Sequence, residues 1–439
     1  MKGISIIHRL LHHGYVMYKT VRARALRPYH LLLYRIVIPK RQRRYIRKLR
    51  NRDKINVVFF AMNVPMWRYQ RLYEAMKEYG CFNVHIVISP TRRFTLEQQV
   101  MDAESLKAYF TERKISFIYN DPHHQHEYYD VKKILNPDIL FYPQPYEGLL
   151  NRKHDYSHFT DRLLCYYPYA FWSSREEWGY NLPFHNLAWK LYNATSINLR
   201  DAQRMADNHG RNVVVVGYPN TDDYLSRIPH DVWKTQSARK KRVIIAPHCT
   251  ISGKADNKSI HGGFLWYGEF VQQLALKYSD KIQFAFKPHP RLKTELYHHP
   301  DWGKEKTDAY YKMWNEMENG QLEEGPFVDL FMTSDALIHD SASFTIEYQY
   351  ARKPSMFLSK DISPYRTTIN DLGNAALDVH YFGTCVEDII AFIDKVILDG
   401  NDTMATVRKD FFNSYLLPPN GNTVTKNTLD DILKSLGRK

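Results

Sequence analysis

Cysteine is scarce in this chain, with four cysteines spread over 439 residues. They are Cys81, Cys165, Cys249 and Cys385, and no two of them form a CxxC pair. A structural zinc site or a disulfide framework needs closely spaced cysteines, so the sequence predicts neither. The same scarcity favours a reducing compartment, the cytoplasm.

Long hydrophobic runs are missing as well. The apolar stretches of the N-terminal region lie within residues 1–11 and 31–38, and both are far shorter than the roughly 20 residues that cross a bilayer. No small-residue cleavage site follows the first stretch, which argues against a signal peptide. We therefore expect neither a membrane-spanning helix nor a cleaved leader.

Several common catalytic motifs are absent. The chain has no GxxxxGK(S/T), no GxGxxG after a strand, no GxSxG and no HExxH. These absences argue against a P-loop kinase, an ordinary dehydrogenase, a serine hydrolase and a zincin. The cluster at His123, His124 and His126 has metal-ligand chemistry but no accompanying motif, so we interpret it as an exposed loop and predict no metal site.

Acidic residues are almost absent from residues 1–54, which hold 16 Lys or Arg and one acid. The remainder is nearly neutral, with 45 Lys or Arg and 46 acids. We predict that residues 1–54 form a helical arm on an anionic membrane, peripheral at the inner face of the cell membrane, with an apolar face made by Leu10, Leu11, Tyr15, Tyr18 and Val21. A solvated tail, a helical extension packed on the body and nucleic-acid binding are the alternatives. The last is disfavoured because the charge is not spread over a folded face.

The rest of the chain alternates short apolar runs with helical patterns, which is typical of βαβ units and a parallel sheet. The first half predicts strands at 55–60, 84–88, 116–119, 138–142 and 212–216, with helices at 67–79 and 96–113. The second half predicts strands at 243–247, 282–286, 336–338 and 355–358, with helices at 266–278 and 341–350. We therefore predict an α/β fold with two Rossmann-like domains, at 55–235 and 236–439, facing a cleft that holds the ligand.

The strongest local signal follows the predicted strand 282–286. Two prolines flank His289 and restrict its backbone at the carboxyl edge of the sheet. Lys287 and Arg291 stand two residues to either side, and three potential cations at one strand end suit a phosphate-rich ligand. We predict His289 as a catalytic residue that donates a hydrogen bond or a proton to a phosphate, with a turn histidine as the alternative.

A second signal follows the predicted strand 336–338. Asp340, Ser341 and Ser343 stand where this strand runs into a helix, and a helix N-terminus with hydroxyl groups binds anions. We predict that these three residues bind the donor phosphates and that Glu347, one turn further on, binds ribose. A plain helix N-cap is the alternative reading of Asp340 or Ser341.

Two further candidates are weaker. His248 also stands at a strand exit, after Ala246-Pro247, and is a candidate catalytic residue. In the first half, aromatic segments at 141–146 and 165–169 follow apolar runs and either line the acceptor side of the cleft or pack as loops.

The set formed by Lys287-Pro288-His289-Pro290-Arg291, by residues 327–343 and by Arg352-Lys353-Pro354 resembles the CDP-glycerol glycerophosphotransferase family, the teichoic-acid primases and polymerases. The resemblance is clearest over residues 243–360, and it implies a GT-B-like fold. It implies that His289 contacts the donor pyrophosphate and that Ser341 and Ser343 belong to the family's serine-bearing helix start, although the usual tyrosine before the serine pair is missing.

The chain departs from the family in its first half. The W-H-G element, whose histidine is thought to be the base in the family, is not found, and Tyr166-Tyr167-Pro168-Tyr169 stands in the corresponding region. Tyr169 is therefore a third catalytic candidate, but a tyrosine with a pKa near about 10 is a poor base. Either another residue, such as His248, deprotonates the acceptor, or the chemistry differs.

Taken with the residues, the resemblance implies a transferase that needs no metal or cofactor and uses its nucleotide-diphosphate donor as a substrate. It would move glycerol- or ribitol-phosphate from a CDP-linked donor, bound by the C-terminal domain, to a hydroxyl of a lipid- or glycan-linked acceptor, bound by the N-terminal domain. Two alternatives stay open: a GT-B glycosyltransferase with a nucleotide-sugar donor, and a non-catalytic nucleotide-binding protein of the same fold.

Overall fold

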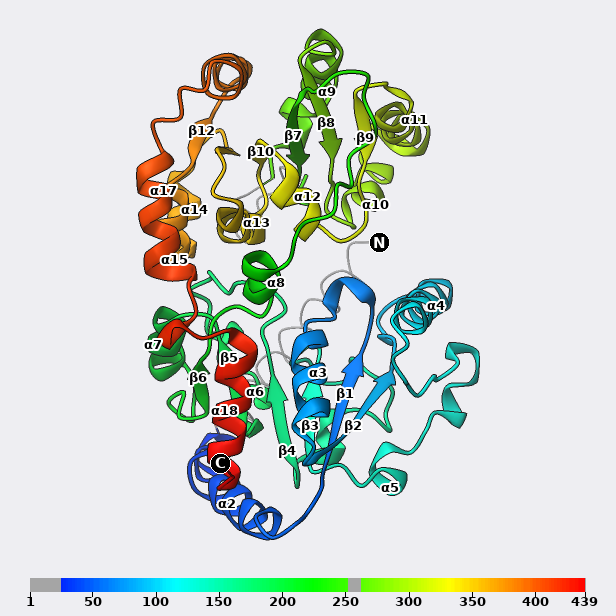
Figure 1. Cartoon of the computed structure of the whole chain (residues 1–439), viewed down its shortest axis with the longest axis vertical. Helices are drawn as coiled ribbons and strands as arrows, with labels where there is room; N and C mark the ends of the chain where they lie inside the picture. The colour runs from blue at the N-terminus through cyan, green and yellow to red at the C-terminus, as the bar shows by residue number, and fades with distance from the viewer. Residues whose placement is uncertain (1–24, 252–261, 439) are drawn as a thin grey trace, which may run out of the picture.

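The computed structural model describes residues 25–251 and 262–438, and these residues form two α/β domains stacked along the long axis of the molecule (Figure 1). Each domain is built on one parallel six-stranded sheet within the described residues. Hydrophobic clusters lie on both faces of each sheet. Among the described helices, none combines the length and the apolar character that crossing a bilayer requires.

The sheet of the N-terminal domain has the strand order β2-β1-β3-β4-β5-β6. Parallel sheets are covered on both faces, so their strands are apolar throughout rather than alternating. Val57, Val58, Phe59 and Phe60 follow this rule and are fully buried in β1. The strands are β1 (Ile55–Ala61), β2 (Phe82–Ile88), β3 (Ile139–Tyr142), β4 (Leu163–Tyr166), β5 (Lys190–Asn193) and β6 (Val213–Val215).

The sheet of the C-terminal domain has the strand order β12-β11-β10-β7-β8-β9. Strands β10, β7 and β8 are direct neighbours, although β10 comes much later in the chain. The strands are β7 (Lys241–Ala246), β8 (Ile282–Phe286), β9 (Gly320–Leu322), β10 (Ala336–His339), β11 (Ser355–Leu358) and β12 (Tyr381–Gly383).

Helices connect the strands and cover the sheets. In the N-terminal domain Gly80 ends α3 in the left-handed conformation, as its position after an amphipathic run predicts. The helices of the first half are α2 (Ile38–Leu49), α3 (Gln70–Tyr79), α4 (Leu96–Glu112), α5 (Val131–Ile134), α6 (Pro183–Leu187), α7 (Ser196–Met205) and α8 (Thr221–Ser226). Those of the second half are α9 (Phe264–Lys277), α10 (Leu292–Tyr297), α11 (Gly303–Glu316), α12 (Val328–Thr333), α13 (Ala342–Glu347), α14 (Ser363–Thr368), α15 (Asp371–Leu377), α16 (Val386–Ala391), α17 (Ala405–Phe411) and α18 (Val424–Leu436).

The two sheets face each other with their carboxyl ends. In Figure 1 the arrowheads of β1 and β4 point toward the C-terminal domain, and those of β7 and β8 point toward the N-terminal domain. Ligands of open α/β sheets bind beyond the carboxyl ends of the strands. The arrangement therefore directs both binding edges to the region between the domains, as the sequence predicts.

The end of the chain corrects the predicted domain assignment. Helix α18 lies beside α3 rather than in the C-terminal domain (Figure 1). Val424, Ile432 and Leu436 belong to the hydrophobic core of the N-terminal sheet. The Tyr167 hydroxyl donates to Thr428 Oγ1 at 2.5 Å. Residues 424–436 therefore complete the first domain, because their apolar residues pack into the hydrophobic core of its sheet.

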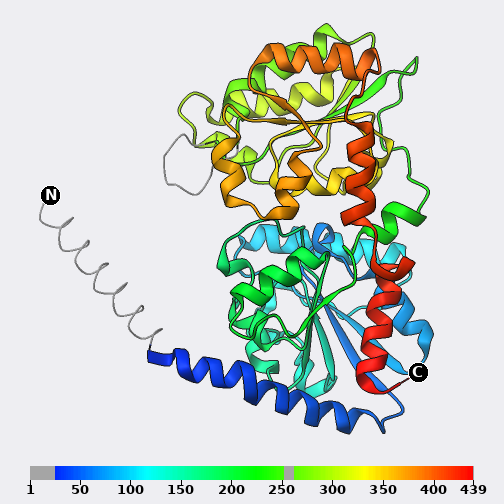
Figure 2. The same ribbon diagram turned by 90° about the vertical axis from the view of Figure 1, so that its left-hand side faces the viewer.

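The predicted N-terminal arm also needs a correction. Helix α2 lies along the edge of the N-terminal domain that faces away from the other domain (Figure 2). Leu49 is fully buried, and the Tyr45 hydroxyl donates to Asp138 Oδ1 at 2.7 Å. Arg52 pairs with the same carboxylate at 2.8 Å. Residues 38–52 are thus a packed part of the domain, while the predicted face from Leu10 to Val21 lies outside the described residues.

The strand predictions were most accurate for fully apolar runs. β8 and β11 match their predicted bounds, whereas the predicted strand 116–119 is reduced to one bridge between Ile118 and Val87. β4, β5, β9 and β12 were not predicted. The loop cluster at His123, His124 and His126 is an exposed 3-10 segment (Pro122–Glu127), as expected.

Candidate functional site

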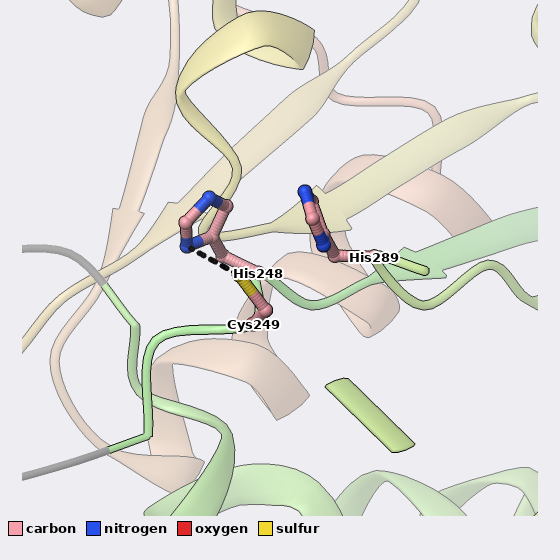
Figure 3. A group of neighbouring side chains, drawn as sticks. All are labelled: His248, Cys249 and His289. Atoms are coloured by element: carbon pink, nitrogen blue, oxygen red, sulfur yellow. Dashed lines mark hydrogen bonds between the residues drawn. The ribbon is translucent and has the colours of Figure 1, made fainter. Parts of the chain in front are cut away.

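The candidate site lies at the ends of three neighbouring strands in the C-terminal domain. His248 follows β7, His289 follows β8, and Asp340 follows β10. Because these strands are adjacent and parallel, the three segments meet at one edge. The imidazole rings of His248 and His289 lie 5.0 Å apart between their centroids (Figure 3). The tertiary structure therefore brings together residues that are far apart in the sequence.

His289 is held in one tautomer by its own turn. Its backbone N–H donates to the carbonyl of Pro247 at 2.9 Å, which ties the exit of β8 to the exit of β7. Its Nδ1 accepts the backbone N–H of Arg291 at 3.1 Å, so the ring proton sits on Nε2. Burial and, to a smaller extent, the charge of Arg291 together lower the pKa of His289 to about 4. At neutral pH the ring is an uncharged N–H donor, which suits a hydrogen bond to a phosphate better than the predicted role of general acid.

His248 is fixed in the same way. Its Nδ1 accepts the backbone N–H of Thr250 at 3.2 Å and lies 2.7 Å from the Thr250 hydroxyl. This arrangement puts the ring proton on Nε2. A general base needs an open lone pair. This geometry therefore does not favour the predicted role of His248 as the base. It favours His248 as a second N–H donor beside His289.

Asp340 does not bind phosphate in this arrangement, which corrects the prediction. It is fully buried, and it accepts the backbone N–H groups of His248 at 2.5 Å and Gly263 at 2.6 Å. Burial raises the pKa of Asp340 to about 6, although these N–H donors oppose the rise. A carboxylate would also repel a diphosphate. Asp340 instead positions His248 and the start of α9.

Ser341 and Ser343 lie at the start of α13, with their hydroxyl oxygens 3.4 Å apart. Two buried histidines support this turn. The Ser341 N–H donates to His339 Nδ1 at 3.2 Å, and His339 Nε2 lies 3.1 Å from His380 Nε2. His380 Nδ1 is 2.7 Å from the carbonyl of Ala376 in α15. With the proton of His339 on Nε2 and that of His380 on Nδ1, every N–H from Ser341 to α15 finds an acceptor. Burial lowers the pKa of both histidines, so His339 and His380 are uncharged at neutral pH.

Lys287 and Arg291 are less directly involved than predicted. Lys287 is buried, and its Nζ donates to the carbonyls of Glu323 and Gly325 at 3.3 and 2.8 Å. Burial lowers the pKa of Lys287 to about 8. It therefore fastens the segment after β9 rather than a phosphate. Arg291 is exposed and pairs with Glu295 at 2.5 Å, so it stands at the rim of the site.

Glu347 is not placed to bind ribose, a further correction. Its carboxylate is buried and accepts from Asn220 Nδ2 at 3.0 Å and from the Tyr224 hydroxyl at 3.3 Å. Burial raises the pKa of Glu347, and the charge of Arg68 opposes this. Because Asn220 and Tyr224 belong to the segment between the two sheets, Glu347 joins α13 to that segment.

Tyr169 lies in the N-terminal domain, after β4. Its hydroxyl is 3.2 Å from the Tyr146 hydroxyl, and burial raises its pKa well above the usual range. A less acidic phenol is an even poorer base than a free tyrosine. Tyr169 instead lines an apolar pocket whose wall also includes Tyr146, Tyr166, Trp172, Trp178 and Leu182.

Three residues of this region were missed from the sequence. Arg68 follows β1 and contacts both domains, since its Nη2 donates to the Tyr169 carbonyl at 3.4 Å and its guanidinium lies 6.0 Å from the ring centre of Phe327. His339 supports Ser341, and Cys249 adjoins His248. His339 is the last residue of the apolar strand β10, and this position could have found it. Arg68 and Cys249 stand in the loops that follow β1 and β7, where no local pattern marks them.

The fold and the site define a GT-B transferase architecture, with two Rossmann-like domains whose binding edges face each other. The family profile described as CDP-glycerol:poly(glycerophosphate) glycerophosphotransferase matches residues 189–432. The chain belongs to this family. A search of curated proteins finds no match.

Solved structures resemble this fold at low sequence identity. The S. aureus MnaA–UDP complex has a TM-score of 0.53 at 12% identity, over 87% of this chain and 97% of that one. A putative UDP-N-acetylglucosamine 2-epimerase from Listeria monocytogenes has a TM-score of 0.53 at 14% identity, over 87% and 96%. A histidine-to-asparagine variant of the wall teichoic acid polymerase TagF, soaked with CDPG, has a TM-score of 0.52 at 13% identity, over 95% and 98%. At these identities the likeness concerns the fold.

Proposed function

We propose that this protein transfers glycerol-phosphate or ribitol-phosphate from a CDP-linked donor to a hydroxyl of a membrane-associated glycan or lipid. Family membership supports the donor class. The observation that carries the proposal is the pair formed by His248 and His289 at adjacent strand ends. Both are neutral imidazoles held as N–H donors, and their ring centroids lie 5.0 Å apart. Such a pair fits the oxygens of a diphosphate. The TagF structure soaked with CDPG has the same fold.

The reaction forms a bond between the acceptor oxygen and the β-phosphorus of the donor. The bond from this phosphorus to the bridging oxygen breaks, and CMP leaves with the electron pair. Charge develops on the phosphate oxygens, and preorganised donors stabilise it. We assign this role to Nε2–H of His248 and His289, helped by the hydroxyls of Ser341 and Ser343.

The proton of the acceptor hydroxyl needs a destination. Tyr169 has too high a pKa to act as a base, and the Nδ1 lone pair of His248 already accepts the N–H of Thr250. The intact donor has no phosphate with a second ionisation, but CMP becomes a phosphate monoester as it leaves, and the second pKa of such a group is about 6, so its departing oxygen gains enough basicity to take this proton. We therefore propose that the proton moves to the departing phosphate of CMP as the bond to the β-phosphorus breaks, so that CMP leaves in protonated form.

Product analysis tests the proposal. With CDP-glycerol or CDP-ribitol and a hydroxyl-bearing lipid-linked glycan, we expect free CMP in an amount equal to the polyol-phosphate incorporated. Release of a nucleoside diphosphate from a nucleotide-sugar would instead identify a glycosyltransferase. Binding of the CDP-linked donors without turnover on any acceptor would identify a non-catalytic protein, and either result would overturn the proposal.

We also propose that the N-terminal helix contacts an anionic membrane. Its described part exposes Leu26, Tyr29, Leu32 and Ile36, which are 39–59% exposed and lie on one side of the helix. Residues 25–54 carry many lysines and arginines and a single acid. Apolar contact and cationic attraction act together at such a surface, and each basic residue contributes on the order of 1 kcal/mol.

Vesicle flotation of the full chain tests the membrane contact. We expect binding to phosphatidylglycerol vesicles and a loss of about tenfold or more in the variant Leu26→Glu/Tyr29→Glu, because both apolar contact and net charge fall. Leu276→Glu is the control, since Leu276 is 53% exposed in the other domain. Equal flotation of the two variants would contradict the proposal.

A further inference from the structure

A polar cavity lies at the end of the C-terminal sheet opposite to His248 and His289. Its volume is about 650 Å³, and its wall consists of residues between 231 and 242 and of the segments that lead into β10 and β11. Strand β7 runs from this cavity toward the histidines, and its six residues span about 20 Å. Because β7 and β8 point toward the N-terminal domain, the cavity opens on the far side of the molecule (Figure 1). It is therefore separate from the proposed transfer site.

The segment that forms most of the wall is held in place by buried side chains. The backbone N–H of Lys234 donates to Gln321 Oε1 at 2.7 Å, and its carbonyl accepts from Gln283 Nε2 at 2.6 Å. Gln283 is 2% exposed and Gln321 is 7% exposed. The indole N–H of Trp233 donates to Thr333 Oγ1 at 3.0 Å. A wall that is ordered in advance lowers the entropy cost of binding a ligand.

The cavity carries a surplus of positive charge. Five cationic side chains line it and two acidic ones, namely Lys234, Arg239, Lys240, Arg242 and Lys353 against Asp231 and Asp335. Arg242 pairs with Asp231 at 2.8 Å, whereas Lys240 Nζ donates to the uncharged Gln236 at 2.9 Å. Arg239 and Lys353 are exposed. Converging cations of this kind suit a ligand with several phosphate groups.

The lining also indicates which phosphate ligand fits. Its one aromatic residue is Trp233, which is 6% exposed and has the guanidinium of Arg242 5.5 Å from its ring centre. Proteins that bind single-stranded nucleic acid stack the bases on accessible aromatic rings. The residues that line this cavity offer no accessible ring. The cavity therefore fits phosphate groups on a flexible aliphatic backbone better than it fits a nucleotide or a nucleic acid.

We propose that this cavity binds the phosphodiester chain of an acceptor that already carries several polyol-phosphate units. The identity of this ligand rests on the proposed function, because such a chain is the product that the transfer would lengthen. An acceptor long enough to reach both places is held by the cavity while its end stands at the transfer site. The second contact raises the effective concentration of the chain end at the transfer site. Longer acceptors should therefore bind more tightly than short ones.

Binding of a fluorescently labelled hexamer of glycerol-phosphate to the full chain tests the cavity. We expect the affinity, measured by fluorescence anisotropy, to fall about tenfold or more in Arg239→Glu/Lys353→Glu, because two phosphate contacts are replaced by repulsion. Lys114→Glu/Lys133→Glu is the matched control. It makes the same change in net charge at two exposed positions of the N-terminal domain and should bind like the wild type. Hydrogen exchange of residues 231–242 should slow when the hexamer binds.

The outcomes separate this proposal from the proposed function. Equal affinity of the two double variants, or unchanged hydrogen exchange at 231–242, would overturn the cavity as a binding site. Competition by CMP or by a thymidine hexanucleotide as effective as that of unlabelled hexamer would overturn the choice of a chain without bases. If no CDP-linked donor releases CMP, the transferase proposal fails, whereas a loss of hexamer binding confined to Arg239→Glu/Lys353→Glu still supports the cavity.

Discussion

Replacing His289 by alanine should lower kcat/KM for a CDP-linked polyol by about 10²–10³, the usual effect of removing one preorganised donor to developing negative charge. The reason is geometric, since the turn after β8 fixes the ring with its Nε2 proton available to a phosphate. The measurement is the initial rate of CMP release at varied donor concentration.

Two further variants separate the hydrogen bond from the mere presence of the ring. His289→Gln keeps an N–H donor at a similar distance from the backbone and should recover part of the lost activity. His298→Ala is the matched control, because His298 is exposed at the end of α10 and its ring hydrogen-bonds the Thr294 carbonyl of the same helix. Wild-type kcat/KM in His289→Ala would remove His289 from the site.

Replacing Asp340 by alanine should lower the free energy of unfolding by about 2–4 kcal/mol. Its carboxylate accepts two backbone N–H groups, those of His248 and Gly263, in a fully buried position. Each buried donor left without a partner costs about 1–3 kcal/mol. Thermal or denaturant unfolding measures the change, and the KM for the donor should rise as well because His248 loses its support.

Asp335→Ala is the control for this prediction. Asp335 accepts one backbone N–H, that of Arg242 at 2.9 Å, at the opposite end of the same strand β10. Removing the Asp335 carboxylate should lower the free energy of unfolding less than Asp340→Ala does, and it should leave the KM for the donor unchanged. If Asp340→Ala and wild type unfold at the same midpoint, the positioning role of Asp340 is refuted.

The elements that the sequence predicted best are those whose apolar runs are unambiguous. β8 consists of Ile282 to Phe286, all buried, and its bounds are as predicted. β5, by contrast, contains Lys190 and Asn193, and its pairing with β4 and β6 defines it rather than its composition. Short polar strands become strands because a neighbour offers hydrogen bonds, and that information is tertiary.

The candidate site divides in the same way. His289 could be found from the sequence because two prolines fix it at a strand exit. Lys287, Asp340 and Glu347 also have suitable residue types, but they are buried and bonded to other parts of the chain. The sequence records the residue type and the strand end, and it does not record which way the side chain turns.

The sequence by itself determined the two α/β halves, the strand ends that carry His248, His289 and Ser341, and the basic character of the N-terminus, because hydrophobic periodicity, proline positions and charge are local properties. Only the tertiary structure decided that β10, β7 and β8 are neighbours, that α18 returns to the first domain, and that α2 packs on its edge. Strand order and helix docking depend on contacts between residues far apart in the chain, and no local pattern encodes them.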